Sequence, residues 1–579
     1  MREKILSGKP SVDKPWLKYY PQVLLDNLQV PACTVEQYLQ FNMPGLDVSA
    51  MHYYGTEVTW QEVFVKSELA AKALKALGFG PNDQIPVFLR SVPEFIYLLL
   101  AAEKLGASLL IRDNTIEENV DAVNKSGAKV LITHDFLSKS DMQAYLDGSK
   151  VEKFVLIDPC TSCDRSQMPD YVEAALDANY PDECASGDEV MNWEQFLSLG
   201  AGDAEPVVSA ANIDSPLIRC YTSGSTGPSK QVIHSARTII GVLTQMNFYA
   251  AADVRPTWLV TILPPTLVAV VISMLLLPLA SNKLLIMAPW LDPNDVDLEL
   301  MRYRPNAWPI IPMFMEVVIR NNRIPDDYDM SHLHAAGCGC EAYNNSQMAR
   351  AQKFLYDHNC NITFTTGYGS SEAGSNVAFH ISDAPMGNGN AGCPMPLSNI
   401  SIFKPGTTQE MTYGDEGEIC ISGPGVMMGY DDPEATSRVL KVHEDGQLWL
   451  HMGDIGRMDE NGVLYTIGRG SNKRFGGGFL DILPMENRIA DAAIPGILDE
   501  FFVNIPDDAH EGYFVPYLYV VLDQGYTVAD VQDAIHAVLD AHMIPAEIIE
   551  LPERPFWHFK TNRIGLMQEV LANRGYAGK

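Results

Sequence analysis

Apolar and polar positions in the first part of the chain alternate between two kinds of segment. Short apolar runs predict β-strands at 84–89, 107–111, 129–133 and 153–158. Segments with apolar residues at helical spacing lie before and among these runs, at 62–77 and 94–105. Strands that alternate with helices in this way favour a parallel sheet with helices on both of its faces.

The pattern changes three times further along the chain. Residues 159–206 are rich in Asp, Glu, Pro, Ser and Cys, which predicts an acidic surface insertion. The alternation then resumes to about residue 400, and residues 399–429 are β-rich with many glycines. We expect an α/β fold whose large N-terminal domain, 1–471, combines parallel-sheet α/β subdomains with a β-rich subdomain. A small, mobile C-terminal α+β domain is expected at 472–579.

Charge and apolar length exclude several classes of partner. The most apolar stretch, 259–279, contains three prolines and is expected to be a buried strand and helix rather than a membrane span. No apolar leader is evident, so a cytoplasmic protein is expected. The chain carries 41 Lys and Arg against 73 Asp and Glu, a net charge of −32, which argues against nucleic acid and anionic membranes as partners.

The ten cysteines of a chain with no evident secretion signal indicate reduced thiols rather than disulfides. We interpret the Cys160–Cys163 spacing as coincidental.

The segment Tyr221–Lys230 has the composition of a phosphate-binding loop. Gly224 and Gly227 allow positive φ, so successive backbone N–H groups can converge on one anion. Hydroxyl side chains and Lys230 add further donors and a positive charge. We expect a strand at 216–221 before the loop and a helix at 232–248 after it. A glycine-rich loop between a strand and a helix is a common arrangement at phosphate-binding sites. On composition alone, a solvent-exposed loop is the alternative.

The order Tyr-Thr-Ser-Gly-Ser-Thr-Gly-x-x-Lys resembles the phosphate loop of the adenylate-forming superfamily, acyl-CoA synthetase type. Further motifs follow in the family's order, at 365–372, 417–423, 449–456, 468–478 and 559–563. The resemblance implies an AMP-forming acid–thiol ligase that uses ATP, Mg²⁺ and coenzyme A. The ATP-binding residues that it implies are Thr222, Ser223, Gly224, Ser225, Thr226, Gly227, Lys230, Gly337, Cys338, Gly339, Gly367, Tyr368, Gly369, Ser370, Asp454 and Arg469.

Particular roles also come from the resemblance. Thr222, Glu372 and Lys560 would be the catalytic residues: Glu372 would hold Mg²⁺, and Lys560 would bridge the acid and the α-phosphate. Asp454 and Arg469 would fix the ribose. Asn472 would lie at the hinge between the domains, and Gly477 and Gly478 beside the thiol tunnel. Alternatively, Glu372 would be an acidic residue that stabilises the start of a helix, and Lys560 would be an ordinary solvent-exposed lysine.

The chain departs from the family in its last motif and at the hinge. Phe559 replaces the glycine before the lysine, Asn562 replaces an aspartate, and Asn472 stands where an Asp or Lys is usual. These departures keep open a third class of function, an inactive adenylate-binding relative.

The acid and the acceptor are less specified. Residues 242–250 lack the Phe-Asp pair that grips an amino acid, and Leu267 replaces a family histidine. We expect a hydrophobic fatty or aryl acid in a pocket lined by Leu267, Met274 and Gly339, although the same stretch could be ordinary core. Coenzyme A is the expected acceptor, and a separate carrier protein is the alternative. A homodimer is possible.

Overall fold

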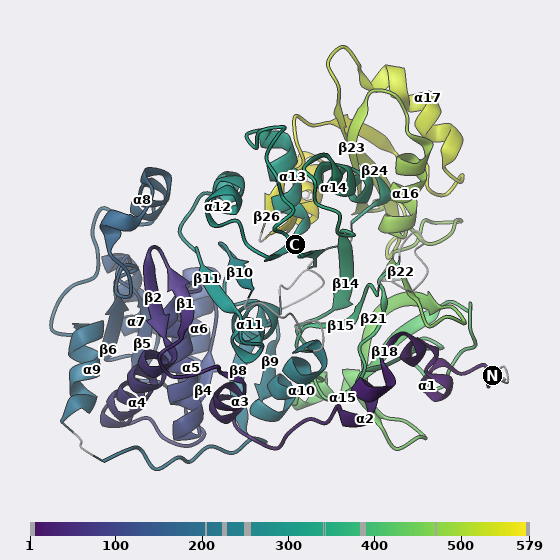
Figure 1. Ribbon diagram of the computed structural model, residues 1–579. Helices are drawn as coiled ribbons and strands as arrows, with labels where there is room; N and C mark the ends of the chain where they lie inside the picture. The colour runs from purple at the N-terminus through teal and green to yellow at the C-terminus, as the bar shows by residue number, and fades with distance from the viewer. Residues whose placement is uncertain are drawn as a thin grey trace.

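The computed structural model describes residues 6–202, 205–222, 229–247, 256–339, 341, 343–381, 390–468, 472–557 and 559–574 (Figure 1). Short N-terminal helices lead into the fold: α1 (Pro10–Asp13), η1 (Pro15–Tyr19), α2 (Gln22–Asn27) and α3 (Val35–Asn42). No helix within these described ranges is both long enough and apolar enough to cross a membrane.

The first large sheet contains the strands predicted from the opening alternation. In spatial order it consists of β19 (Gly429–Tyr430), β9 (Gln231–Ser235), β8 (Pro216–Tyr221), β4 (Ser108–Leu110), β3 (Gln84–Phe88), β5 (Val130–His134), β6 (Lys153–Ile157) and β7 (Val190–Asn192). Its helices are α4 (Trp60–Ala76), α5 (Pro93–Leu105), α6 (Ile116–Ser126), α7 (Lys139–Gly148), α8 (Asp170–Asp177), α9 (Trp193–Ala201) and α10 (Ala236–Met246). The apolar helix α5 is almost wholly buried, starts at Pro93 and ends at Gly106 with φ +70°.

Two expectations about this sheet are wrong. The helix expected at 232–248 does not begin at 232, because residues 231–235 form β9, which pairs antiparallel with β8. Val232 and Ile233 are β-branched, and the helix starts only after Ser235, whose capping box with Thr238 ends the strand. The segment 159–206 is also more than a surface insertion, because β7 extends the sheet and α9 buries Trp193 and its neighbours.

The second large sheet carries most of the predicted site motifs. Its order is β16 (Cys393–Pro394), β15 (Asn376–Phe379), β14 (Thr365–Gly369), β13 (Ala335–Cys338), β12 (Ala307–Ile310), β10 (Thr257–Val260), β11 (Leu284–Met287), β1 (Ser49–Tyr53) and β2 (Thr56–Thr59). Helices α12 (Val296–Tyr303), α13 (Pro312–Asn321) and α14 (Asn345–Asp357) connect its strands. The stretch 259–279 contains β10, a π-helix (Val270–Leu276) and α11 (Leu277–Ala280), which confirms the expected buried strand and helix.

A five-stranded sheet follows and confirms the β-rich subdomain. It contains β17 (Asn399–Phe403), β18 (Gly417–Ser422), β20 (Leu440–Val442), β21 (Leu448–Met458) and β22 (Leu464–Gly468), with α15 (Pro433–Val439) beside it. Because β21 pairs with both β18 and β22, the motifs at 417–423 and 449–456 lie side by side.

The C-terminal residues form an α+β unit with two apolar clusters of its own. The buried residues of one cluster come from positions 480–543, and those of the other come from positions 501–566. Its elements are α16 (Ile482–Ala492), β23 (Ile497–Pro506), β24 (Phe514–Leu522), α17 (Val528–Val538), β25 (Glu547–Glu550), the hairpin β26 (Phe556–Trp557) and β27 (Lys560–Thr561), and α18 (Arg563–Asn573). The unit contacts α13 and α14 of the large domain (Figure 1). These separate clusters support a division near residue 471, which stays a prediction.

Candidate functional site

The base of the predicted phosphate loop is closed by hydrogen bonds between its two ends. Thr222 N donates to Lys230 O at 2.9 Å, and Lys230 N donates to Thr222 Oγ1 at 3.0 Å. Ser229 Oγ donates to Thr222 O at 2.6 Å. The loop therefore connects two antiparallel strands rather than a strand and a helix. Its predicted ATP contacts Ser223, Gly224, Ser225, Thr226 and Gly227 lie outside the described residues.

Tyr430 joins the loop lysine to the predicted metal-binding carboxylate. Lys230 Nζ lies 5.1 Å from the centroid of the Tyr430 ring, and Tyr430 OH donates to Glu372 Oε1 at 2.8 Å. Glu372 is 6% exposed, and its carbonyl accepts a hydrogen bond from Met427 N. A carboxylate oxygen beside a phosphate loop is a suitable Mg²⁺ donor, so Glu372 fits its predicted role. Tyr430 was not predicted as a site residue, although it follows the motif at 417–423 closely.

The predicted ATP-binding residue Tyr368 and the predicted ribose residue Asp454 are also in contact. Tyr368, on β14, donates from its OH to Asp454 Oδ2 of β21 at 2.7 Å. Ser370 Oγ lies 3.8 Å from Met452 Sδ on the same strand as Asp454. Tyr368 and Glu372 are four residues apart in the sequence. The Tyr368–Asp454 and Tyr430–Glu372 contacts therefore both lie near the end of β14. Arg469, the other predicted ribose residue, lies outside the described residues.

The glycines of this edge are needed for different reasons. A Cβ at Gly369 would lie 2.1 Å from Ser375 O, and one at Gly367 would lie 2.8 Å from Asn376 Nδ2. Both glycines therefore permit the close approach of β15 and of Ser375 before it.

At the end of β13 the space is more open. A Cβ at Gly337 would meet Phe379 Cζ and Thr365 Oγ1 at 3.3 Å, but the nearest atom at Gly339 is Asn376 Oδ1 at 3.9 Å. Cys338 pairs with Thr366 through the sheet, and its side chain is not among those described. Gly339 thus leaves room beside the Asn376 amide, a polar group that sequence analysis did not identify.

Lys560 lies on a hairpin that is docked to the end of β13. Its neighbour Thr561 donates from N to Glu341 Oε2 at 3.0 Å, and Arg563 forms an ion pair with the same carboxylate. Burial alone would raise the pKa of Glu341, but the charge of Arg563 and the Thr561 hydrogen bonds hold that pKa below its usual value. Glu341 therefore remains a charged anchor that holds the Lys560 hairpin against the large domain.

The predicted hinge and thiol residues lie within the C-terminal unit. Asn472 O accepts a hydrogen bond from Leu480 N at 2.9 Å. His542 covers both glycines of the predicted tunnel, since a Cβ at Gly477 or Gly478 would lie 2.8 or 2.9 Å from its atoms. A side chain at either position would therefore require His542 to move.

The predicted acid-pocket residues Leu267 and Met274 are half-buried and pack against the main core. Ser273, which precedes Met274 in the sequence, hydrogen bonds to Ser375, the residue just before β15. This link connects the π-helix to the strand that approaches Gly369. Whether Leu267 and Met274 contact an acid stays a prediction.

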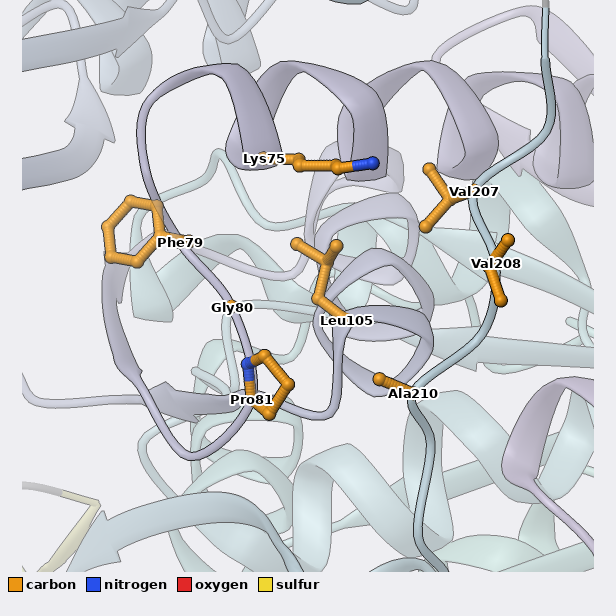
Figure 2. Close-up of a pocket in the computed structure, with 8 residues that line it drawn as sticks. All are labelled: Lys75, Phe79, Gly80, Pro81, Leu105, Val207, Val208 and Ala210. Atoms are coloured by element: carbon orange, nitrogen blue, oxygen red, sulfur yellow. The ribbon is translucent and has the colours of Figure 1, made fainter.

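A surface cavity of about 160 Å³ lies elsewhere, between the ends of α4 and α5 and the segment 207–210 (Figure 2). It is lined by Lys75, Phe79, Gly80, Pro81, Leu105, Val207, Val208 and Ala210. None of the predicted site residues contributes to it.

The family model described as "AMP-binding enzyme" matches residues 40–431. The chain therefore belongs to the AMP-binding enzyme family, which confirms the predicted superfamily. It is 26% identical over 521 residues to 4-coumarate–CoA ligase 2 of Oryza sativa subsp. japonica, covering 85% of each chain. It is 24% identical over 535 residues to a long-chain-fatty-acid–CoA ligase of Bacillus subtilis (strain 168), covering 88% of this chain and 90% of that one.

The fold agrees with a solved structure as well. ATP-bound MatB from Rhodopseudomonas palustris superposes with a TM-score of 0.75 at 19% identity, over 94% of this chain and 100% of that one. This confirms the predicted fold class. The predicted enzyme class, an AMP-forming acid–thiol ligase, agrees with the names of both relatives.

Proposed function

We propose that the protein activates a hydrophobic carboxylic acid with ATP and transfers the acyl group to coenzyme A. Two contacts between sheets carry this proposal: Tyr430 joins Lys230, next to β9 of the first large sheet, to Glu372, and Tyr368 pairs with Asp454 of the five-stranded sheet. Glu372 follows Tyr368 by four residues, which links the two contacts. Under this proposal, Lys230 and Glu372 would serve the phosphates, and Tyr368 and Asp454 would serve the nucleoside.

In the first half-reaction, the acid's carboxylate attacks the α-phosphorus of ATP and pyrophosphate leaves. The attack brings two anions together and builds charge on the phosphate oxygens, so positive groups must be arranged beforehand. Lys230 and the amides of its loop would stabilise the leaving pyrophosphate. Lys560 would lie between the carboxylate and the α-phosphate, and Tyr368 and Asp454 would orient adenine and ribose. Mg²⁺, held by Glu372, would supply further neutralisation of the phosphates.

In the second half-reaction, the thiol of coenzyme A attacks the acyl carbon of the mixed anhydride. The thiol loses a proton, AMP leaves, and a thioester forms. No protein nucleophile is required because AMP is already a good leaving group. Rotation of the C-terminal unit about Asn472 would withdraw Lys560 and bring Gly477 and Gly478 to the acyl group.

The acid is proposed to be fatty or aryl. Leu267 and Met274 are apolar, and the relatives include ligases named for 4-coumarate and for long-chain fatty acids.

One experiment distinguishes this proposal from the carrier-protein alternative and from the inactive alternative. Pyrophosphate release is measured with a panel of fatty, aryl and amino acids, with and without coenzyme A, and the products are identified by mass spectrometry.

A thioester formed from a fatty or aryl acid supports the proposal. Adenylate without thioester would favour a carrier protein as acceptor, and no pyrophosphate with any acid would favour the inactive relative. Lys560→Ala should lower kcat/KM for pyrophosphate release by about 10²–10³-fold. Lys353→Ala is the matched control, because Lys353 is an exposed lysine paired with Asp357 on α14. Equal rates for the two variants would refute the role of Lys560.

A further inference from the structure

A cluster of metal-ligating side chains lies in the five-stranded sheet and has no part in the proposed reaction. Glu418 and Cys420 are two residues apart on β18, so their side chains lie on the same face. Cys420 is the direct cross-strand partner of His451 on β21. All three residues are buried. Strand alternation and register therefore bring a carboxylate, a thiol and an imidazole to one point.

The separations of the donor atoms suit a single ion. Cys420 Sγ lies 3.3 Å from His451 Nδ1, and that nitrogen lies 3.1 Å from Glu418 Oε2. All three donor atoms lie within 4.8 Å of one another. Bonds of about 2.0–2.3 Å around a tetrahedral zinc ion place neighbouring ligand atoms about 3.3–3.6 Å apart. Small side-chain rotations would therefore complete the coordination.

The surroundings hold these donors in position. His451 Nε2 lies 2.9 Å from Nε2 of His443, which stacks on Trp449. With Nδ1 on a metal, His451 Nε2–H would donate to His443, the usual support for a ligating histidine. The Glu418 carboxylate accepts hydrogen bonds from Gly406 N and Gly453 N, each at 3.2 Å. Gly453 has φ +75°, and this backbone turn points its N–H at Glu418.

We infer that Glu418 Oε2, Cys420 Sγ and His451 Nδ1 bind one divalent transition-metal ion, with Zn²⁺ the best match. Thiolate and imidazole ligands select Zn²⁺ over Mg²⁺ and Ca²⁺, which take oxygen donors. Binding releases the thiol proton, and the thiolate and carboxylate then balance the charge of the ion in a buried site. A water molecule would occupy the fourth position. The site is separate from the magnesium carboxylate Glu372.

The test uses the intact chain and Co²⁺, which replaces Zn²⁺ and has a visible spectrum. The protein is stripped with a chelator, dialysed under reducing conditions and titrated with Co²⁺. We expect one equivalent of Co²⁺ to give tetrahedral d–d bands and a thiolate-to-cobalt charge-transfer band, both lost on adding Zn²⁺. Cys420→Ser should remove the charge-transfer band. Cys360→Ser, which alters another buried free cysteine, should retain it.

Elemental analysis of the untreated protein gives a second measurement, in which we expect about one zinc per chain for the wild type and Cys360→Ser. The inference is overturned if the wild type binds no Co²⁺ with a thiolate band, since the cluster is then a metal-free hydrogen-bond network. It is equally overturned if Cys420→Ser keeps that band. The wild-type titration decides the question even if Cys420→Ser fails to fold.

Discussion

Replacing Glu341 by glutamine would test how Lys560 is held at the site. Glu341 is a buried carboxylate that accepts two hydrogen bonds from Thr561 and pairs with Arg563. Glutamine has nearly the same shape and can still accept from Thr561 N, but it loses the charge that faces Arg563. Because Arg563 keeps its pair with Glu486, at 2.9 Å, it is not left without a partner.

The expected cost follows from that single lost charge. A hydrogen bond to a charged group contributes about 1.5–3 kcal/mol, and the pair is too buried for solvent to screen it. This energy belongs to the docked arrangement alone, in which the hairpin contacts Glu341. At about 1.4 kcal/mol per tenfold change, docking weakens by about 10- to 150-fold.

The two half-reactions give opposite expectations. Adenylation needs the docked hairpin, so pyrophosphate release should fall in Glu341→Gln by up to that factor. Thioester formation from a supplied acyl-adenylate needs the hairpin withdrawn, so its rate should not fall. The rates of both half-reactions are measured by quenching the reaction at set times under single-turnover conditions. An equal fall in both rates, or an unchanged rate of adenylation, would refute the reasoning.

Glu553→Gln is the matched control. Glu553 forms an ion pair with Arg320 between the same two parts of the chain, but its side chain is 60% exposed. Exposed pairs contribute about 0–1 kcal/mol, so this variant should change adenylation by no more than a few-fold.

Three further predictions concern the site edge and the interface. Tyr430→Phe removes the hydrogen bond to Glu372 at a cost of about 1 kcal/mol, so the KM for Mg²⁺-ATP should rise about five-fold in steady-state assays; an unchanged KM would contradict it. Gly369→Ala should lower the free energy of unfolding by about 1–3 kcal/mol because its Cβ would lie 2.1 Å from the backbone carbonyl of Ser375, whereas Gly339→Ala should leave Tm unchanged. Burial, reinforced by a neighbouring aspartate, raises the pKa of Glu500 to about 8 in the folded protein, against 4.5 as its ordinary value. The folded state then binds the extra proton between these values, so stability should fall as pH rises from about 4.5 to 8, and Glu500→Gln should reduce that slope in denaturant titrations.

The strands and motifs that local sequence specifies were predictable. The apolar runs at 84–89 and 153–158 match β3 and β6 closely, because each is short, apolar and bounded by turn residues. The segment after the phosphate loop was not predictable in the same way. Its apolar spacing suits a helix from 232 onward, and pairing with β8 and β19 adds to the β-branched residues Val232 and Ile233 in making residues 231–235 a strand.

Site residues whose role depends on distant partners were also missed. Tyr430 is separated from Lys230 by two hundred positions in the chain, and β19 brings them together by pairing with β9. No role was predicted for Glu341, yet it anchors Thr561 and Arg563, which lie more than two hundred positions later in the chain. Local patterns predict which residues can bind a nucleotide, whereas long-range pairing decides which of them meet.

The two departures in the last motif are accommodated by the fold. Phe559 has φ +64°, so the chain keeps the backbone conformation that a glycine would adopt, at a cost of about 1–2 kcal/mol. Its ring lies edge-to-face with Phe314 of α13, with centroids 6.3 Å apart, and such a contact offsets part of that cost. Asn562 caps α18 by accepting from Gly565 N at 3.0 Å, a role that aspartate performs equally well. Since both substitutions preserve the local backbone around Lys560, neither is by itself an argument for an inactive protein, and pyrophosphate release by the wild type with the panel of acids decides the question.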